Sequence, residues 1–583
     1  MTNRAALQID GPTARKERGA FFTPAALADY LTDWAVRGVH DRVLEPSCGE
    51  AAFLVAAARR LIQLGAVATH GQVDGVELHA ESARAAAAAA AGAGWPVSVV
   101  AADFFTVPAA RVYDAVIGNP PYIRYQDFAG DSRVKARAAA LAAGVPLTGL
   151  ASSWAAFTVH AAQFLAPSGR LGLVLPAELL SVNYAAEVRR HLMATFGRVR
   201  LVLFSERVFP GVQEEVVLLL AEDALAPGGT DHCELHQVRG TADLAGIAGQ
   251  SDSSKGHRWA PRTTRGKWTA ALLSESALAA YTRLEDDPAF TTLKTWGDTT
   301  LGTVTGNNRY FALSPARAAE LELPQSELLP LSPPGSRHLR GLSLAPSAWA
   351  ELGRAQSATW LFRPPAQLSE CSSAARAYIA AGELAGVDRA YKCRVRTPWW
   401  RVPLVPPADL LLTYMNADTP RLTTNRARVH HLNSVHGVYL RPGLRALGGD
   451  LLPLASLNTM TLLGAETVGR SYGGGMLKLE PSEADVLPLP APDVVAACRP
   501  ELSALRPQMG SALRSGRLVD AVRMVDTVLL VGALGLPRKQ VRELEDAHRN
   551  LTARRMTRSR QGARSSEGVP IADSARLSVE TVR

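Results

Sequence analysis

The first 225 residues alternate short apolar runs with helix-like stretches, and this alternation limits the possible folds more than any other feature of the 583-residue chain. Runs such as 72–78 and 113–118 are too short for helices, and each is followed by a stretch with helical spacing or by turn residues. Strand–helix repeats of this kind favour an α/β fold with a doubly wound, mostly parallel sheet. Ligands of such sheets bind beyond the carboxyl ends of the strands, near the point where the strand order reverses.

The pattern changes after residue 225. Residues 226–257 are rich in Gly, Ser, Asp and Pro, which is typical of a linker. Short strands, frequent prolines and fewer helices over 258–500 predict a separate α+β domain, and residues 501–564 predict a C-terminal helical segment. The tail, 565–583, has the composition of a disordered end. We therefore expect a doubly wound domain over 1–225, a linker, an α+β domain and C-terminal helices.

Composition sets weaker limits. A net charge of +9 permits a polyanionic partner, but a general enrichment in arginine explains it equally well. None of the five cysteines forms a C-x-x-C pair, which argues against a disulfide framework or a zinc ribbon and for a reducing compartment. The chain starts without an apolar signal segment, and no apolar run is long enough to cross a bilayer. These features predict a cytoplasmic protein without a membrane partner.

Three predicted strands end in residues that suit a nucleoside ligand. The first runs into the turn Glu45-Pro46-Ser47-Cys48-Gly49, where the glycine admits close backbone approach and the next helix offers free N–H groups. The second ends at Glu77, a carboxylate that suits a ribose diol. The third ends at Asp103, which suits an exocyclic amine, with Phe104 beside it for the ring face. The alternative for each acid alone is a helix cap, and for the turn a bare strand–helix connection.

The fourth predicted strand ends in Asn119-Pro120-Pro121-Tyr122. A planar –NH2 group is a poor nucleophile because its lone pair is delocalised, and acceptors on both of its N–H bonds turn that pair towards a methyl donor. Asn119 offers an amide oxygen and Pro120 a carbonyl, for which neither proline has a competing N–H. The residue before a proline is held extended, and Tyr122 offers a flat face for a planar target. The tetrapeptide therefore predicts transfer to a planar amine by positioning and electrostatic complementarity.

These motifs carry a resemblance to a known family. Asn119-Pro120-Pro121-Tyr122 is the NPPY motif of amino-methyltransferases that use S-adenosylmethionine, and "GAFFTP" (19–24) resembles the N-terminal motif of gamma-class DNA adenine-N6 methyltransferases. "RVFPGVQEEVVLLLAE" (207–222) is similar to the motif whose aromatic residue stacks on the extruded base. The strings "RTPWWRVP", "LNSVHGVYL" and "GRSYGGGMLKLEPSE" resemble the target-recognition domain of restriction–modification methylases of the Eco57I type. One departure is Ala51, where the family often has a second glycine.

The resemblance implies a Rossmann-like methyltransferase domain that uses S-adenosylmethionine, followed by a target-recognition domain. The implied reaction is site-specific methyl transfer to the N6 amine of a flipped adenine in double-stranded DNA, as the modification component of a restriction–modification system. The alternatives are a methyltransferase of RNA or of a protein glutamine, and a non-catalytic DNA-binding defence component. The residues implied to contact the cofactor are Thr23, Glu45, Ser47, Gly49, Glu77, Asp103, Phe104, Asn119 and Pro121. Those implied to hold the target base are Asn119, Pro120, Tyr122 and Phe209, and a core aromatic is the alternative for Phe209.

Residues 258–500 form the only predicted domain large enough to read a DNA sequence. Its candidate DNA-contacting residues are Arg396, Arg401, Arg421, Asn425, Arg426 and Arg428, together with Arg470 and Lys478, which flank glycines; solvated surface is the alternative for each. His430, His431 and His436 lack acidic or cysteine partners in the sequence, so we expect no metal site. No nuclease domain is apparent, so any cognate restriction endonuclease is expected to be a separate chain. We expect a monomer.

Overall fold

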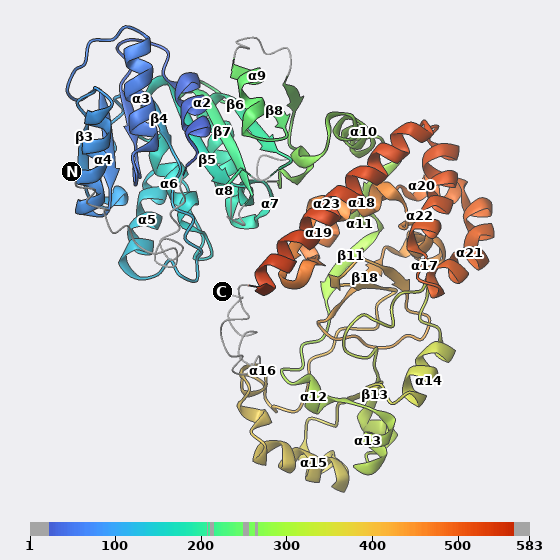
Figure 1. The fold of residues 1–583 in the computed structure, drawn as a ribbon. Coiled ribbons are helices and arrows are strands. Elements are labelled where there is room, and N and C mark those ends of the chain that lie inside the picture. The colour runs from blue at the N-terminus through green and yellow to red at the C-terminus, as the bar shows by residue number, and fades with distance from the viewer. Residues whose placement is uncertain (1–22, 207, 210–214, 249–255, 263–265, 565–583) are drawn as a thin grey trace, which may run out of the picture. The chain divides into compact units, whose positions relative to one another are not determined.

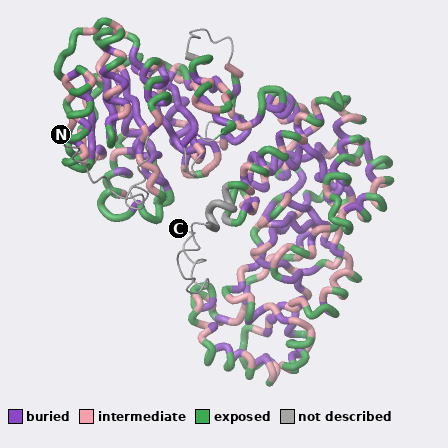
Figure 2. The backbone as a smooth tube through the Cα atoms, viewed as in Figure 1, coloured by how far each residue is buried: buried purple, intermediate pink, exposed green. Residues whose placement is uncertain are grey.

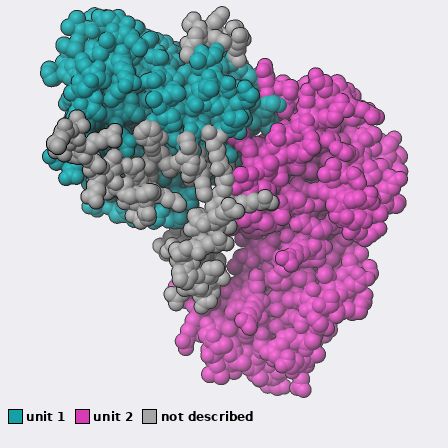
Figure 3. Space-filling model, viewed as in Figure 1, with its two compact units in different colours: residues 1–274 teal, residues 275–583 magenta. Residues whose placement is uncertain are grey.

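The computed structural model describes residues 23–564 except 207, 210–214, 249–255 and 263–265, so most of the "GAFFTP" motif lies outside the described residues. Figure 1 shows the order of the helices and strands along the chain. The chain divides into two compact units, residues 1–274 and 275–583, coloured separately in Figure 3. Buried residues, purple in Figure 2, concentrate inside each unit, so each has a core of its own.

The first unit is built on one nine-stranded sheet with the order β3-β2-β1-β4-β5-β7-β6-β8-β9. Its strands are β1 (Val43–Glu45), β2 (Val73–Glu77), β3 (Ser98–Ala101), β4 (Tyr113–Gly118), β5 (Leu165–Pro176), β6 (Phe196–Phe204), β7 (Val216–Ala224), β8 (Cys233–Val238) and β9 (His257–Trp259). Strands β1 to β5 pair in parallel, whereas β7 lies antiparallel between β5 and β6. The predicted doubly wound, mostly parallel sheet is confirmed.

Helices cover both faces of this sheet. They are α2 (Ala25–Ala35), α3 (Ala52–Gln63), α4 (Ala80–Gly92), α5 (Gly130–Ala142), α6 (Ser153–Ala162), α7 (Glu178–Ser181), α8 (Ala186–Thr195) and α9 (Ala245–Ala248). On β4, Ala115 and Ile117 pack in one cluster with Leu31 of α2 and Leu54 of α3. The side chain of Val116 points to the opposite face, because residues alternate along a strand, and it is fully buried as well. A strand buried on both sides explains the continuous apolar run in the sequence.

The segment predicted as a linker, residues 226–257, contributes to the sheet. Strand β8 pairs in parallel with β6, β9 adds to its outer edge, and the first unit extends to Ser274. Cys233 and Leu235 of β8 are buried, whereas polar residues alternate with them or lie beside them. A short strand at the side of a sheet carries so few apolar residues that its sequence is similar to that of a loop.

The second unit combines small antiparallel sheets with helices. Its strands are β10 (Phe290–Thr292), β11 (Gly297–Leu301), β12 (Ala312–Leu313), β13 (Leu328–Pro330), β14 (Trp360–Phe362), β15 (Leu410–Thr413), β16 (Met415–Asn416), β17 (Leu422–Thr424), β18 (Val435–Leu440), β19 (Arg470–Tyr472), β20 (Met476–Lys478) and β21 (Pro488–Pro490). The central sheet has the order β11-β18-β15-β17. The helices are α10 (Glu275–Asp286), α11 (Leu293–Trp296), α12 (Asn308–Phe311), α13 (Pro315–Glu320), α14 (Pro346–Arg354), α15 (Ser373–Leu384), α16 (Tyr391–Arg394), α17 (Arg445–Ala455), α18 (Thr459–Val468), α19 (Pro481–Asp485), α20 (Pro492–Ala497), α21 (Arg499–Arg514), α22 (Leu518–Asp526) and α23 (Arg538–Arg564).

The predicted C-terminal helices form part of the second unit and share its core. Leu502 and Met509 of α21 and Val525 of α22 pack in one cluster with Leu410 and Leu412 of the central sheet. The apolar faces of these helices therefore complete the core of the predicted α+β domain. Within the part of the chain that the structure describes, no helix is long and apolar enough to cross a membrane.

Helix α23 is attached to this unit by a buried ion pair. The side chains of Arg555 and Glu466 are each 4% exposed, and their closest nitrogen and oxygen atoms are 2.8 Å apart. Arg555 also donates to the main-chain carbonyls of Gly475 and Asp418. A buried guanidinium needs such a complete set of acceptors, because an unpaired buried charge is costly. The last turns of the chain's final helix thus hold the glycine-rich turn at 473–475.

Candidate active site

The strand order reverses beside β1 and β4, and the turns that follow these two strands lie together. Val43 and Leu44 of β1 pair with Ala115 and Val116 of β4, so the turn at 45–49 meets the residues that follow Gly118. A methyl group added to Gly118 would lie 3.5 Å from Cδ of Pro46, which shows how closely the two chains approach. Two motifs separated by about seventy residues in the sequence therefore form one site at the carboxyl edge of the sheet.

The side-chain amide of Asn119 is held from both ends. Its Nδ2 donates to Oγ1 of Thr23 over 3.2 Å, and its Oδ1 accepts from the hydroxyl of Tyr122 over 2.7 Å. The same hydroxyl lies 2.9 Å from the carbonyl oxygen of Val174 on β5. An amide oxygen has two lone pairs, so Oδ1 can accept a second hydrogen bond while it stays oriented. Among the described residues, none donates a hydrogen bond to the carbonyl of Pro120.

Ser153, at the start of α6, fixes the turn that carries Asn119, a role that no sequence pattern indicated. Its Oγ donates to the carbonyl of Pro121 over 2.5 Å and accepts from the N–H of Ile123 over 2.9 Å. The N–H of Ser153 donates to the carbonyl of Ile123 over 3.0 Å. The side chain is fully buried, so water does not compete for these contacts. Three hydrogen bonds from one residue therefore join the Asn119–Tyr122 turn to a helix of the core.

The turn after β1 is organised by Glu45. This residue is 3% exposed, and its Oε2 accepts from the N–H of Leu54, which lies in the first turn of α3. Burial raises the pKa of the Glu45 carboxyl well above its usual value, and the nearby Glu77 raises it further. A carboxyl at this position satisfies helix N–H groups that have no partner within the helix. Glu45 thus orients the start of α3.

Ala51 has a left-handed backbone, with φ of 66°. This is the position where the sequence departs from the family's second glycine. A left-handed conformation costs a residue with a Cβ about 1–2 kcal/mol, and glycine adopts it freely. Ala51 is also fully buried. The departure therefore places strain in the backbone of the turn.

Glu77, at the end of β2, connects to the turn after β1. Its Oε2 accepts from the N–H of Gly49 over 3.0 Å, and its Oε1 accepts from the N–H of His79 over 3.1 Å. The next residue, Leu78, is 62% exposed, which is unusual for a leucine beside a buried strand and provides an apolar surface for a flat ring. At the end of β3, Asp103 accepts from the N–H of Phe105 and lies 3.7 Å from Nζ of Lys135. These carboxylates and this apolar side chain fit a nucleoside.

The two phenylalanines expected in the site are buried. Phe104 is 3% exposed, and its ring stacks with Phe157 and Phe164 at centroid distances of 5.4 and 5.2 Å. Phe209 is 3% exposed and belongs to the core cluster that contains Phe204. In this structure Phe104 anchors the turn that carries Asp103, and the placement of Phe209 matches the core alternative that the sequence left open.

The described residues contain no group of three or more His, Cys, Asp or Glu side chains that could hold a metal ion. In the second unit, the ring nitrogens of His430 and His436 bond to the carbonyls of Val405 and Leu479. His431 is fully buried, and burial lowers its pKa to about 4. His430 and His436 therefore hold main-chain carbonyls, whereas both ring nitrogens of His431 are buried without a hydrogen-bond partner among the described residues.

Two family models match this chain, and the boundary between the matched segments lies close to the boundary between the two structural units. Residues 7–225 match the family model of N-6 DNA methylases, and residues 265–530 match that of the C-terminal domain of the type II methyltransferase M.Eco57I. The type II methyltransferase M.XamI of Xanthomonas campestris pv. amaranthicola is 26% identical over 505 residues, which cover 84% of this chain and 89% of the relative. M.AccI of Acinetobacter calcoaceticus, another type II methyltransferase, is 23% identical over 477 residues, covering 80% and 84%.

Solved structures are more distant. The type IIL restriction–modification enzyme MmeI in complex with DNA matches with a TM-score of 0.49 and 12% identity, over 91% of this chain and 75% of that chain. The type IIG restriction endonuclease BpuSI matches with a TM-score of 0.45 and 12% identity, over 94% and 67%.

Proposed function

This chain belongs to the DNA adenine-N6 methyltransferases of restriction–modification systems, and on that premise we propose where its reaction takes place. The target amine is held by the side-chain amide of Asn119, beside the turn after β1. The observation that carries the proposal is the double anchoring of this amide by Thr23 and Tyr122 at the end of β4. A fixed acceptor oxygen at the reversal of the strand order is what transfer to a planar amine requires.

S-adenosylmethionine supplies the methyl group, whose attachment to a positively charged sulfur makes it electrophilic. The residues proposed to hold this cofactor are Thr23, Ser47, Gly49, Glu77, Asp103, Asn119 and Pro121, with Glu45 and Phe104 as supports behind them. The carboxylates of Glu77 and Asp103 are acceptors for hydroxyl and amine donors, and Leu78 offers apolar contact for a flat ring. Gly49 has a φ of 43°, a conformation in which the absence of a side chain lets the main chain approach a ligand.

The target adenine must leave the DNA stack, because its amine cannot reach a pocket of this kind inside a duplex. In the proposed arrangement Oδ1 of Asn119 and the carbonyl of Pro120 accept the two N–H bonds of the amine. Both acceptors are neutral, and their geometry draws the nitrogen's lone pair out of conjugation with the ring. The hydroxyl of Tyr122 keeps the Asn119 oxygen oriented, and the ring of Tyr122 is proposed to contact the base.

Ser153 is proposed as a positioning residue for this reaction. We expect Ser153→Ala to lower kcat by about 10- to 100-fold, because the Asn119–Tyr122 turn loses the two hydrogen bonds made by the Ser153 hydroxyl and keeps only the one from its main-chain N–H. Small displacements of reacting groups are costly. The KM for DNA is expected to stay within twofold. The control is Thr158→Ala, which removes another buried hydroxyl of α6 that bonds only to the carbonyl of Trp154 in its own helix. Equal kcat values for the two variants would show that Ser153 only stabilises the fold.

The second unit is proposed to read the DNA sequence, as expected for residues 258–500. The second unit is large enough to contact several base pairs, and most of it matches the C-terminal domain of M.Eco57I. The first unit already contains every group proposed for the chemistry. A cognate restriction endonuclease on a separate chain, and a monomeric state, are further parts of this proposal.

Methyl transfer from labelled S-adenosylmethionine tests the proposal directly. The substrates are duplex DNA, RNA and a glutamine-containing peptide, and modification-sensitive sequencing of a host genome that expresses the chain gives the modified atom with its sequence context. We expect N6-methyladenine at one recurring DNA sequence. Transfer only to RNA or to the peptide would favour the alternative enzymes, and cofactor or DNA binding without any transfer would favour a non-catalytic defence component.

A further inference from the structure

The polar residues predicted as DNA contacts differ in the structure: some are buried or paired, and others have exposed side chains. Arg421 is 5% exposed and pairs with Asp418, and Asn425 is 2% exposed and holds its own loop through the carbonyls of Ala408 and Val429. Arg396 and Arg401 donate to main-chain carbonyls of the same unit. Arg470 and Lys478, which flank the glycines, also have acidic partners. Arg470 pairs with Glu483, and Lys478 pairs with Glu480. Two of the original candidates, Arg426 and Arg428, have exposed side chains.

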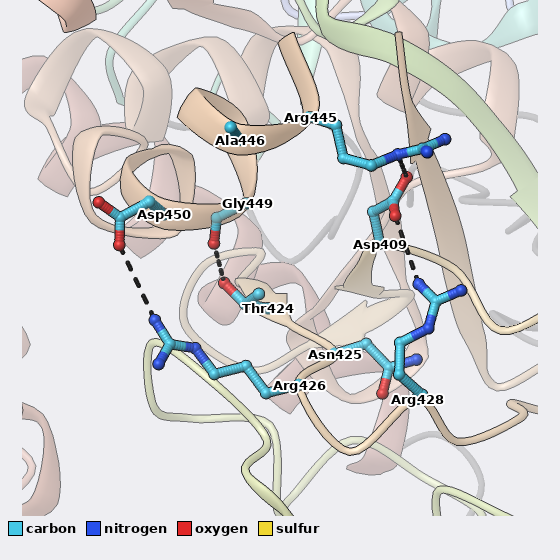
Figure 4. A pocket seen from close by; sticks show the side chains of 9 residues that line it. All are labelled: Asp409, Thr424, Asn425, Arg426, Arg428, Arg445, Ala446, Gly449 and Asp450. Atoms are coloured by element: carbon cyan, nitrogen blue, oxygen red, sulfur yellow. Dashed lines mark hydrogen bonds and ion pairs between the residues drawn. The ribbon is translucent and has the colours of Figure 1, made fainter. Parts of the chain in front are cut away.

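Both of these arginines line one hollow, and a third arginine joins them. The hollow has a volume of about 340 Å³ and lies between the loop that follows β17 and the first turns of α17. Figure 4 shows Asp409 between the guanidinium groups of Arg428 and Arg445, with Arg426 extended towards Asp450. The side chains of Arg426, Arg428 and Arg445 are 53%, 62% and 62% exposed. Three exposed cations from two segments therefore meet at one opening.

The acidic residues of this hollow hold the arginines loosely. The nitrogen–oxygen distances are 3.4 Å from Asp409 to Arg428, 3.4 Å from Asp409 to Arg445 and 3.8 Å from Asp450 to Arg426. Strong charge-assisted hydrogen bonds measure about 2.7–2.9 Å, so these pairs leave most guanidinium N–H groups without a close acceptor. The two carboxylates have shorter contacts elsewhere, to the N–H of Leu440 at 3.0 Å and to Arg506 at 2.9 Å.

The frame of the hollow is rigid although its arginines are exposed. Oγ1 of Thr424 donates to the carbonyl of Gly449 over 2.8 Å and so joins the end of β17 to α17. The side chain of Asn425 closes the loop from within, as described above. Arg428 has a left-handed φ of 50°, which fixes the direction in which its side chain leaves the loop. The hollow also adjoins the N-terminal turn of α17, where the helix dipole favours an anion.

We propose that Arg426, Arg428 and Arg445 form a cradle for one phosphate group of the DNA backbone. This inference rests on the proposed function, because it takes duplex DNA as the substrate. Guanidinium groups suit phosphate because their N–H donors match two oxygens at once. A phosphate contact fixes the position of a protein on DNA and carries no sequence information, so the cradle sets the register of the second unit while other groups read the bases.

The test compares the triple variant Arg426→Gln/Arg428→Gln/Arg445→Gln with a control triple variant, Arg317→Gln/Arg354→Gln/Arg517→Gln. The control removes the same charge from three exposed arginines of the same unit that pair with acids on their own helices. Binding of fluorescent duplex DNA, with and without the methylated sequence, is measured over a range of salt concentrations. We expect the cradle variant to bind both DNAs about tenfold more weakly at 0.1 M salt, and the slope of log K against log salt to become shallower by about 0.9, as for one lost phosphate contact.

Several results would overturn the cradle. These are equal weakening of the two triple variants, an unchanged salt slope, and a loss confined to the methylated sequence, which would indicate base reading instead. The matching triple arginine-to-lysine variant is expected to regain most of the salt slope, since lysine keeps the charge and loses the forked geometry. If the cradle variant is unstable, Arg445→Gln alone keeps Asp409 paired with Arg428 and is expected to show a smaller loss of the same kind. If the wild type methylates DNA and the cradle variants bind DNA normally, only the cradle is rejected. If the wild type binds no DNA, the proposed function is rejected as well.

Discussion

Replacement of Asn119 by alanine is expected to lower kcat for methyl transfer by about 10³-fold or more, since loss of a single oriented hydrogen-bonding group at a reacting centre has effects of this order. The amide oxygen is the side-chain acceptor in the proposed site, and Tyr122 and Thr23 hold it in place. Binding of duplex DNA is expected to stay within twofold, because the second unit is proposed to supply the phosphate contacts and the contacts that read the sequence. Single-turnover transfer and fluorescence anisotropy measure the two quantities.

Two further variants distinguish chemistry from stability at this position. Asn183→Ala removes an exposed amide of the same unit and is expected to leave turnover unchanged. Asn119→Asp keeps an acceptor oxygen but replaces the amide that donates to Thr23, and is expected to retain partial activity. Wild-type turnover in Asn119→Ala would remove this residue from the reaction and with it the basis of the proposed mechanism.

A second large effect is expected from Asp526→Asn, at high pH only. Asp526 is 2% exposed, and its carboxyl contacts both the N–H and the hydroxyl of Thr459, at 2.8 and 2.6 Å. Its pKa is raised from 3.8 to about 7, mainly by burial and with a smaller contribution from the nearby Glu545, whereas the hydrogen bonds from Thr459 and the charge of Arg523 oppose the rise. The folded protein therefore binds a proton that the unfolded chain has released, and its stability falls as the pH rises from about 4 to about 7.

An asparagine at position 526 imitates the protonated acid, because its oxygen accepts from the N–H of Thr459 and its nitrogen donates to the hydroxyl. We expect Asp526→Asn to match the wild type near pH 4 and to exceed its free energy of unfolding by up to about 4 kcal/mol above pH 7. Urea denaturation at several pH values measures the difference. Asp520→Asn, an exposed acid of the same helix, is the control. A constant difference between wild type and Asp526→Asn across this range would contradict a shifted pKa.

The sequence was sufficient to place the main groups of the candidate site at one edge of the sheet. The carboxyl ends of parallel strands meet at the same edge, so strand-end residues such as Glu45, Glu77 and Asn119 come together whatever the details of the helices between them. The fold of the first unit follows from the same alternation. These predictions succeed because they depend on spacing along the chain and on a general rule of sheet topology.

Other features depend on packing that spacing does not reveal. Phe104 and Phe105 are neighbours in the sequence, yet burial among Phe157 and Phe164 singles out the first. Ser153 lies thirty residues after Ile123, and no local pattern marks a serine at a helix start as the support of a distant turn. The left-handed backbone of Ala51 is equally invisible, because alanine usually avoids it.

Burial also decides which arginines of the second unit are available to a ligand. Arg421 and Arg428 lie seven positions apart in similar polar surroundings. Arg421 is buried and paired with Asp418, whereas the side chain of Arg428 is exposed. Arg445 was missed because it begins a helix outside the arginine-rich stretch. The sequence therefore identified two members of the proposed cradle, Arg426 and Arg428, and missed the third.

The separate cores of the two units have a consequence for how new specificities arise. The backbone passes from one unit to the other at Ser274–Glu275, and the clusters that stabilise each unit draw on their own residues. Recombination between relatives near this junction would give hybrids in which both halves remain folded. On the proposed division of roles, such an exchange would direct the same catalytic unit to a different DNA sequence in one genetic event.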